Sequence, residues 1–167
     1  KRLNELLEQY GEDLVHEATV ELKARASKLM RAYISRLPDG EFEAVDWLDN
    51  DGISDDPLKI KIKLKISGEK MTLDFSDTSP ACLGPVNISR STTVAACYVA
   101  MKHVFPEVPA NSGVLEPVDF IIDENSMLIV CSNHMLLNFD FRHLFCRILY
   151  LSWHPRDSKN MQKPIVF

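Results

Sequence analysis

Strict alternation of apolar and polar residues between positions 60 and 75 is the feature that most limits the fold. Isoleucine or leucine occupies every second position of residues 60–66, with lysines between them, and the alternation returns over residues 71–75. Successive side chains of a strand point to opposite faces of a sheet. The pattern therefore predicts two half-buried strands, joined by a turn at Ser67-Gly68.

Before Gly40 the apolar residues follow the 3.6-residue period of a helix instead. Residues 14–37 predict a long amphipathic helix that ends before Pro38-Asp39-Gly40. A shorter apolar face over residues 3–10 predicts a preceding helix that stops or turns sharply at Gly11.

A second helix is predicted to run to about His103, with Ser89 and Ser91 as alternative N-caps. Its small residues permit a close approach to a sheet. We therefore expect an α+β fold in which the long N-terminal helix and this second helix pack on a mixed or antiparallel sheet. The expected strands cover about residues 41–48, 58–66, 70–76 and 117–122.

Composition limits the class of protein. The chain has 167 residues, of which 46% are hydrophobic, enough for one domain with a real core. A net charge of −5 argues against a protein that binds duplex nucleic acid, and no uninterrupted apolar span reaches membrane length. The four cysteines are spread without a C-x-x-C pair, as is typical of free thiols in a reducing compartment. We expect a cytoplasmic protein.

Polar residues gather where the strand over residues 70–76 ends. Ser76, Asp77, Thr78 and Ser79 precede Pro80, and rigid Gly84-Pro85 and Asn87 follow. Such a segment either presents hydroxyls and carboxylates to a ligand or forms a turn capped by its own side chains. The residues alone leave both explanations open.

This segment resembles the hydantoinase B/oxoprolinase family. The matching motifs are Leu73-Asp-Phe-Ser-Asp-Thr-Ser-Pro80, Gly84-Pro85-Val-Asn87, Arg2-Leu-Asn-Glu-Leu-Leu7, Tyr10-Gly11, Leu37-Pro-Asp-Gly40, Asp49-Asn-Asp-Gly52 and Val108-Pro-Ala-Asn-Ser-Gly113. The resemblance continues to about Leu128 and so covers roughly three quarters of the chain, residues 1–128, as a partial domain. Asp77 departs from the family, which usually has glycine there.

The resemblance implies a function. Members open hydantoin or 5-oxoproline rings with ATP, or carboxylate acetone or acetophenone. ATP is bound by a partner subunit or domain of the hydantoinase A type, and a divalent metal belongs to a region N-terminal to the part of the family seen here. The chain is thus expected to be a fragment that is inactive alone. A non-catalytic scaffold is the alternative.

The resemblance also implies site residues, although the catalytic residues stay unknown. Expected substrate-binding residues are Ser76, Thr78, Ser79, Asn87 and Asn111; expected structural loop residues are Gly84, Pro85 and Gly113. Ser76, Thr78 and Asn87 would supply hydrogen bonds to a substrate carbonyl or phosphate.

The sequence gives little support for a nucleophilic, phosphate-binding or metal site of a familiar kind. No histidine lies near Ser76, Ser79 or Cys82, and no nucleophile elbow, phosphate loop or H-E-x-x-H helix occurs. The acidic residues 46–56 lack the alternation and closing glutamate of an EF-hand, so a solvated turn is expected there and no metal site.

From residue 129 the sequence no longer follows the family. Residues 129–167 contain no glycine, and apolar residues become denser. A shifted reading frame, an unspliced segment or an unusual splice form would each produce this tail, and a divergent but genuine helix is the competing explanation. We expect the tail to be loosely packed and to promote self-association.

Overall fold

The computed structural model describes residues 1–129 of the chain. The expected domain boundary near residue 128 therefore falls at the edge of this range. The tail over residues 129–167, with its expected loose packing, lies outside the described residues apart from Ile129.

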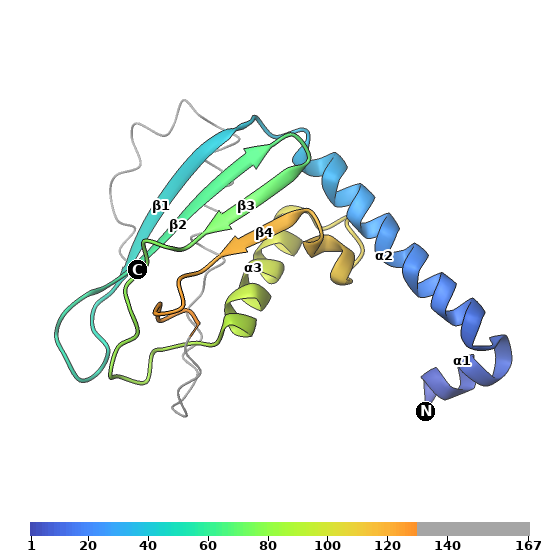
Figure 1. The fold of residues 1–167 in the computed structure, drawn as a ribbon, viewed down its shortest axis with the longest axis horizontal. Coiled ribbons are helices and arrows are strands. Elements are labelled where there is room, and N and C mark those ends of the chain that lie inside the picture. Colours follow the sequence, from blue (N-terminus) through green and yellow to red (C-terminus); the bar gives the residue numbers. More distant parts are fainter. Residues whose placement is uncertain (130–167) are drawn as a thin grey trace.

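A four-stranded mixed sheet forms the body of the molecule (Figure 1). Its strands are β1 (Gly40–Leu48), β2 (Leu58–Ser67), β3 (Lys70–Asp74) and β4 (Val118–Ile121), in the order β1-β2-β3-β4. The first three strands are antiparallel neighbours, and β4 runs parallel to β3. The predicted α+β fold and its four strands are confirmed, with the sheet mixed rather than fully antiparallel.

The alternation of the sequence becomes the two faces of this sheet. Phe42 lies opposite Leu64, which lies opposite Leu73, and Leu73 in turn lies opposite Phe120, so all four strands contribute to one apolar face. The other face carries the lysines of β2. Fully buried residues of the core include Met30, Ile34, Ile60, Ile62, Leu64, Ile66, Met71, Leu73, Phe75, Met101 and Met127.

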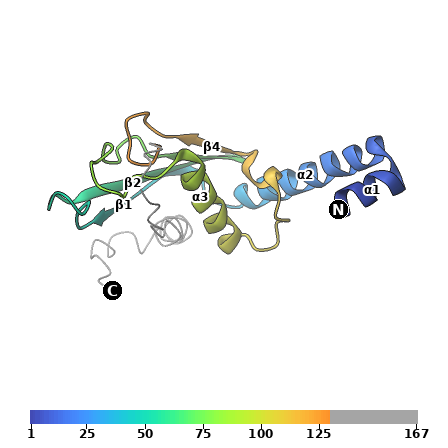
Figure 2. The same ribbon diagram turned by 90° about the horizontal axis from the view of Figure 1, so that it is seen from below.

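Two helices contribute side chains to this core: one lies across a face of the sheet (Figure 2), and the other meets the sheet at the end where β2 turns into β3 (Figure 1). The last third of α2 (Glu12–Ile34) buries Ala26, Met30 and Ile34, and α3 (Arg90–Val104) buries Cys97, Ala100 and Met101. Of the two candidate caps, Ser89 is the N-cap of α3, and its hydroxyl accepts a hydrogen bond from the backbone N–H of Thr92. A short 3-10 helix, η1 (Ser112–Leu115), packs against α2.

The N-terminal half of α2 extends beyond the sheet, with α1 (Arg2–Tyr10) folded back beside it (Figure 1). The sharp turn expected at Gly11 is present, with a φ of 80° that favours glycine. No residue of 1–25 is buried. We call residues 2–25 the arm. No helix among the described residues is long and apolar enough to cross a membrane.

Candidate functional site

Two loops meet at the end of the sheet where β1 stops and β2 begins (Figure 1). One connects β1 to β2 over residues 49–57, and the other follows β3 over residues 75–89. The second loop contains most of the residues that the sequence predicts as a site. Hydrogen bonds between side chains and backbone fix the second loop to β2 and to itself, and one bond, from Gly84 to Asp51, joins the two loops.

Thr78 and Ser79 extend the sheet beyond the end of β3. The Thr78 hydroxyl accepts from the backbone N–H of Lys61 at 3.1 Å and donates to the Lys61 carbonyl at 3.0 Å. The Ser79 hydroxyl accepts from the N–H of Lys59 at 2.8 Å, and the Ser79 N–H donates to the Lys59 carbonyl at 2.9 Å. These side chains therefore complete β2's backbone pairing where a strand neighbour is missing.

Asn87 closes the turn that contains Gly84-Pro85. Its Oδ1 accepts from the N–H of Cys82 at 3.0 Å, while its Nδ2 donates to the carbonyls of Cys82 and Gly84 at 2.7 and 3.3 Å. Both amide hydrogens of this buried side chain are thus committed to the loop itself. Pro85 is exposed on the outer side of the turn.

Asp51 joins the two loops and was not predicted as a site residue. Only 5% of it is exposed, and its carboxylate accepts hydrogen bonds from Ile53, Ser54 and Gly84 backbone N–H groups at 2.7–3.0 Å. The bonds from Ser54 and Ile53 are the main reason why the pKa of Asp51 lies below its ordinary value, and the bond from Gly84 adds to them. The solvated turn expected at residues 46–56 thus contains one buried acid.

Gly84 fits against Asp51 because it has no side chain. A Cβ at this position would lie 1.8 Å from the Asp51 carbonyl oxygen, a distance that no packed atom tolerates. This close approach explains why the loop needs glycine, independently of backbone flexibility.

Ser76 is the predicted residue that stays exposed. Its backbone N–H and hydroxyl both donate to Asp74 Oδ1, which forms a tight turn at the end of β3. Ser76 thereby presents its hydroxyl oxygen at the surface beside Asp74, with its acceptor lone pairs unused among the described residues.

Asp77, the departure from the family pattern, binds the lysine face of the sheet. Its carboxylate lies 2.7 Å from Lys63 Nζ and 3.2 Å from Lys61 Nζ, and Lys61 also pairs with Glu43 at 2.9 Å. Hydrogen bonds to Lys63 and Lys61 lower the pKa of Asp77; bonds to Glu43 and Asp77 raise the pKa of Lys61. The backbone of Asp77 has a negative φ, so it adopts no conformation that would require glycine.

Asn111 and Gly113 lie elsewhere, at the junction of η1 with α2 (Figure 1). Asn111 Nδ2 donates to the Leu22 carbonyl at 3.1 Å, and its Oδ1 accepts from the Gly113 N–H at 2.9 Å. A Cβ on Gly113 would lie 2.1 Å from the Lys23 carbonyl oxygen. The structure therefore does not bring these two residues together with Ser76, Thr78, Ser79 and Asn87.

The described residues supply little reactive chemistry of their own. Burial and the nearby charge of Asp51 raise the pKa of Cys82, and burial raises the pKa of Cys97 to about 12, so both are protonated thiols near neutral pH. Within residues 1–129, no group of three or more His, Cys, Asp or Glu side chains is placed to hold a metal ion.

Comparison with known proteins finds several relatives that each match about three quarters of this chain. The putative B-type subunit of a D-/L-hydantoinase from Pseudomonas sp. (strain NS671) is 34% identical over 139 residues, which cover 76% of this chain and 24% of that protein. The acetophenone carboxylase delta subunit of Aromatoleum aromaticum is 26% identical over 76% of this chain and 19% of its own length. The 5-oxoprolinase of Dictyostelium discoideum is 28% identical over 75% of this chain and 10% of its own length.

Two solved structures share the fold. The ATP-dependent caprolactamase of Pseudomonas jessenii superposes with a TM-score of 0.73 and 21% identity, over 94% of this chain and 28% of that one. A nucleotide-free acetone carboxylase superposes with a TM-score of 0.75 and 15% identity, over 93% of this chain and 23% of that one.

The chain spans about a quarter or less of the length of the curated relatives named here. The family model of Hydantoinase B/oxoprolinase matches residues 1–138, which include every helix and strand assigned within residues 1–129. The chain belongs to the hydantoinase B/oxoprolinase family.

Proposed function

We propose that this chain is part of a cytoplasmic subunit of an ATP-dependent enzyme that opens cyclic amides of the hydantoin or 5-oxoproline kind. The observation that carries the proposal is the match to the family over residues 1–138, together with 34% identity to the B-type subunit of a hydantoinase. The chain is inactive alone, because it spans 24% of that relative's length. The remaining machinery then belongs to other segments and to a hydantoinase A-type partner.

The loop over residues 76–87 is the proposed substrate-facing surface. Ser76 is exposed and offers an oxygen to a ring N–H or another donor of the substrate. Thr78, Ser79 and Asn87 were expected to bind substrate directly, but their hydrogen bonds favour a role in holding the loop. Asn111 was also expected to bind substrate, but its hydrogen bond to Leu22 favours a role in fixing η1 to α2, away from this loop.

ATP and a divalent metal ion are expected for the complete enzyme. The described residues do not fit the metal, because they contain no donor set of three suitable side chains, and the sequence has no phosphate loop. The proposal therefore assigns this chain the shaping of the substrate surface and assigns nucleotide and metal binding to other parts of the assembly.

Carboxylation of a ketone is the second candidate activity. It is favoured by the similarity to an acetophenone carboxylase delta subunit, at 26% identity over 76% of the chain. A non-catalytic scaffold is the third candidate, and it is favoured by the loop side chains of Thr78, Asn87 and Asp51, which bond to backbone groups of this chain. Activity measurements distinguish the three.

The test uses the complete parent subunit, reconstituted with its partner, and measures turnover with ATP. Hydantoin, 5-oxoproline and a ketone with bicarbonate are the three substrates. Ser76→Ala should lower turnover about tenfold or more, since a lost hydrogen bond in a site costs about 1–3 kcal/mol. Its unfolding midpoint should stay unchanged because Ser76 is exposed.

Two variants serve as references for that experiment. Thr78→Val removes both bonds to Lys61 and should lower the unfolding midpoint as well as turnover. Ser112→Ala changes an exposed serine of η1, the short helix that packs against α2, and should change neither. Unchanged turnover in Ser76→Ala would show that the loop is a structural turn. Turnover only with the ketone would replace cyclic-amide hydrolysis by carboxylation.

A further inference from the structure

The arm leaves apolar side chains in water. Leu14 is 54% exposed and Val20 is 53% exposed, although a helix of this length usually buries one face. On α1 the exposed apolar residues are Leu3, Leu6 and Tyr10. The buried residues of α2 all lie in its C-terminal part, from Ala26 to Ile34. Some further surface is therefore needed to cover the arm.

Charge is segregated along one face of α2. Asp13, Glu17, Glu21, Arg25, Lys28 and Arg31 recur at spacings of three and four residues, which places them on a single stripe. We call this set the acid–base stripe. Its first three members are acidic and its last three are basic, so its charge changes sign near residue 23. Within the stripe, Arg25 and Glu21 form an ion pair at 2.6 Å between two exposed side chains.

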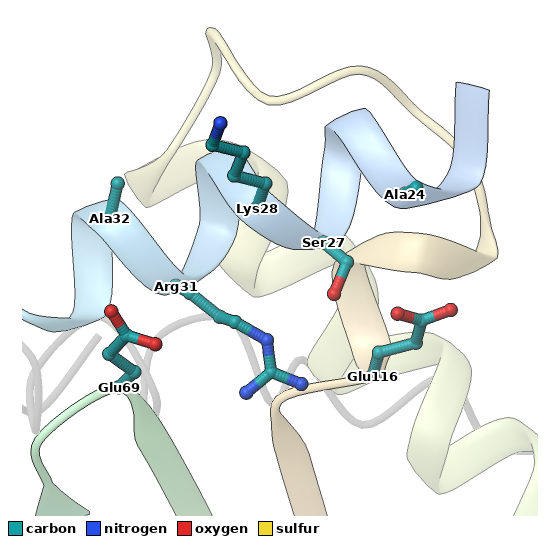
Figure 3. A pocket seen from close by; sticks show the side chains of 7 residues that line it. All are labelled: Ala24, Ser27, Lys28, Arg31, Ala32, Glu69 and Glu116. Atoms are coloured by element: carbon teal, nitrogen blue, oxygen red, sulfur yellow. The ribbon is translucent and has the colours of Figure 1, made fainter. Parts of the chain in front are cut away.

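A groove lies beside the basic half of the stripe (Figure 3). Its volume is about 420 Å³, and it is lined by Ala24, Ser27, Lys28, Arg31, Ala32, Glu69 and Glu116. Arg31 extends between Glu69 and Glu116, so the floor of the groove holds one cation between two carboxylates, while Lys28 extends away from the strands. The small side chains of Ala24 and Ala32 leave room for another helix to approach closely.

We propose that α2 pairs with α2 of a second copy of this chain, antiparallel and about a twofold axis near residue 22. In this arrangement the acidic half of each stripe lies along the basic half of the other, with Glu17 of each copy beside Lys28 of the other. Leu14 and Val20, which flank the stripe, enter the groove of the opposite copy.

Antiparallel self-pairing follows from the charge pattern rather than from apolar exposure alone. A parallel pair would place acid on acid and base on base, which is destabilising. A twofold axis uses the same patch on both copies, so one self-complementary stripe with a sign change at its centre is sufficient. α2 has 23 residues and is about 34 Å long, enough for both halves to be engaged.

The test is the mass of the full chain by sedimentation equilibrium, up to on the order of 100 μM, where even a micromolar pair forms. The wild-type chain should have twice its 19.0 kDa mass. Glu17→Lys with Glu21→Lys makes the stripe basic, and Arg25→Glu with Lys28→Glu makes it acidic. Each double variant alone should dissociate at least tenfold more readily. An equimolar mixture of the two should restore the dimer, because both halves of the mixed interface attract.

A matched control changes the charge equally elsewhere. Asp55→Lys with Glu124→Lys alters two exposed acidic residues, one in the loop after β1 and one after β4, and should leave the dimer intact. Glu17→Lys alone provides a milder variant if a double variant unfolds, as monitored by circular dichroism. A monomeric wild type would overturn the proposal, because a second copy would then not cover the arm. A dimer that survives both charge reversals would also overturn it, because another surface would then hold the two copies together. A mixture that stays monomeric would overturn it equally.

Discussion

Asp51 is the residue on which the two loops of the candidate site depend. It is buried and accepts three backbone N–H groups, from Ile53, Ser54 and Gly84, and these bonds hold its pKa below the ordinary value of 3.8. A carboxylate whose pKa is lower in the folded state stabilises the fold fully above the unfolded-state pKa. That contribution is lost as the pH falls through the folded-state pKa.

We therefore predict that the loss of stability caused by Asp51→Asn depends on pH. The amide keeps one acceptor oxygen but places an N–H group against a donor, so the bond to Gly84 is lost. The variant should be less stable at pH 7, and the loss should shrink below pH 4 as the wild-type carboxylate is protonated. Urea unfolding between pH 7 and pH 2.5 measures this difference. A difference that is constant across this range would show that the Asp51 charge contributes nothing.

Gly84→Ala tests the close approach of the two loops. The added methyl would overlap the Asp51 carbonyl oxygen, which lies 1.8 Å from the ideal Cβ position. Displacing a buried loop in this way should cost about 1–3 kcal/mol of unfolding free energy. Leu83→Ala is the matched control because Leu83 is 89% exposed and should change stability little. Equal stability of Gly84→Ala and the wild type would mean that the loops separate without cost.

The sequence located this site better than it assigned the roles of its residues. The polar segment after β3 was predicted because a local pattern marks a strand end, and Ser76, Thr78 and Asn87 all lie there. The partners of Thr78 and Gly84 were not predictable, since they lie 17 and 33 residues away in sequence, at Lys61 and Asp51. Asp51 looked like one solvated acid among several, and only tertiary structure shows that it is buried.

At the scale of elements, periodicity was a reliable guide because it is local. β2 was expected over residues 58–66 and covers Leu58–Ser67; the expected strand over 70–76 ends earlier, at Asp74. The difference arises because Asp74 accepts from the Ser76 N–H and turns the chain. Alternation does not specify strand direction, so the parallel pairing of β4 with β3 was not predictable.

The open face of the sheet gives a prediction at this scale. Asp77 pairs with Lys61 and Lys63. Bonds to Glu43 and Asp77 raise the pKa of Lys61, the bond to Asp77 raises the pKa of Lys63, and the two lysines lower the pKa of Asp77. The lysine contribution is fully present below pH 10.5 and is lost as the pH rises through the folded-state pKa; the Asp77 contribution is lost only in acid. Asp77→Ala should therefore be slightly less stable than the wild type at pH 7.

Salt provides the decisive measurement for that variant. The pairs are partly exposed, so about 1 M NaCl should remove most of the stability difference. Asp119→Ala, at an exposed position of β4, is the control, and its stability should not depend on the Lys61–Lys63 pairs. A stability difference for Asp77→Ala that persists in high salt would indicate that loop conformation, rather than charge, is what Asp77 changes.

At the scale of the whole molecule, the chain combines a well-packed sheet with surfaces suited to further contacts. The core of the body includes side chains of α2 and α3, while the arm and the groove beside Arg31 stay open. The curated relatives named here are four to ten times longer than the matched segment. In the proposed function, catalysis therefore belongs to a larger assembly, and this part contributes one loop to it.

Because the proposed function assigns catalysis to a larger assembly, we predict that the isolated chain has no catalytic activity. Its described residues hold no three-ligand metal site, and its two described cysteines are protonated near neutral pH. Purified chain with ATP and Mg²⁺ should release no phosphate above the background of a mock purification, with or without hydantoin, 5-oxoproline or acetone. A reconstituted parent complex assayed in parallel establishes that the conditions support turnover. Phosphate release that scales with the concentration of the isolated chain, and that falls in Ser76→Ala, would place the catalytic machinery within these 167 residues instead.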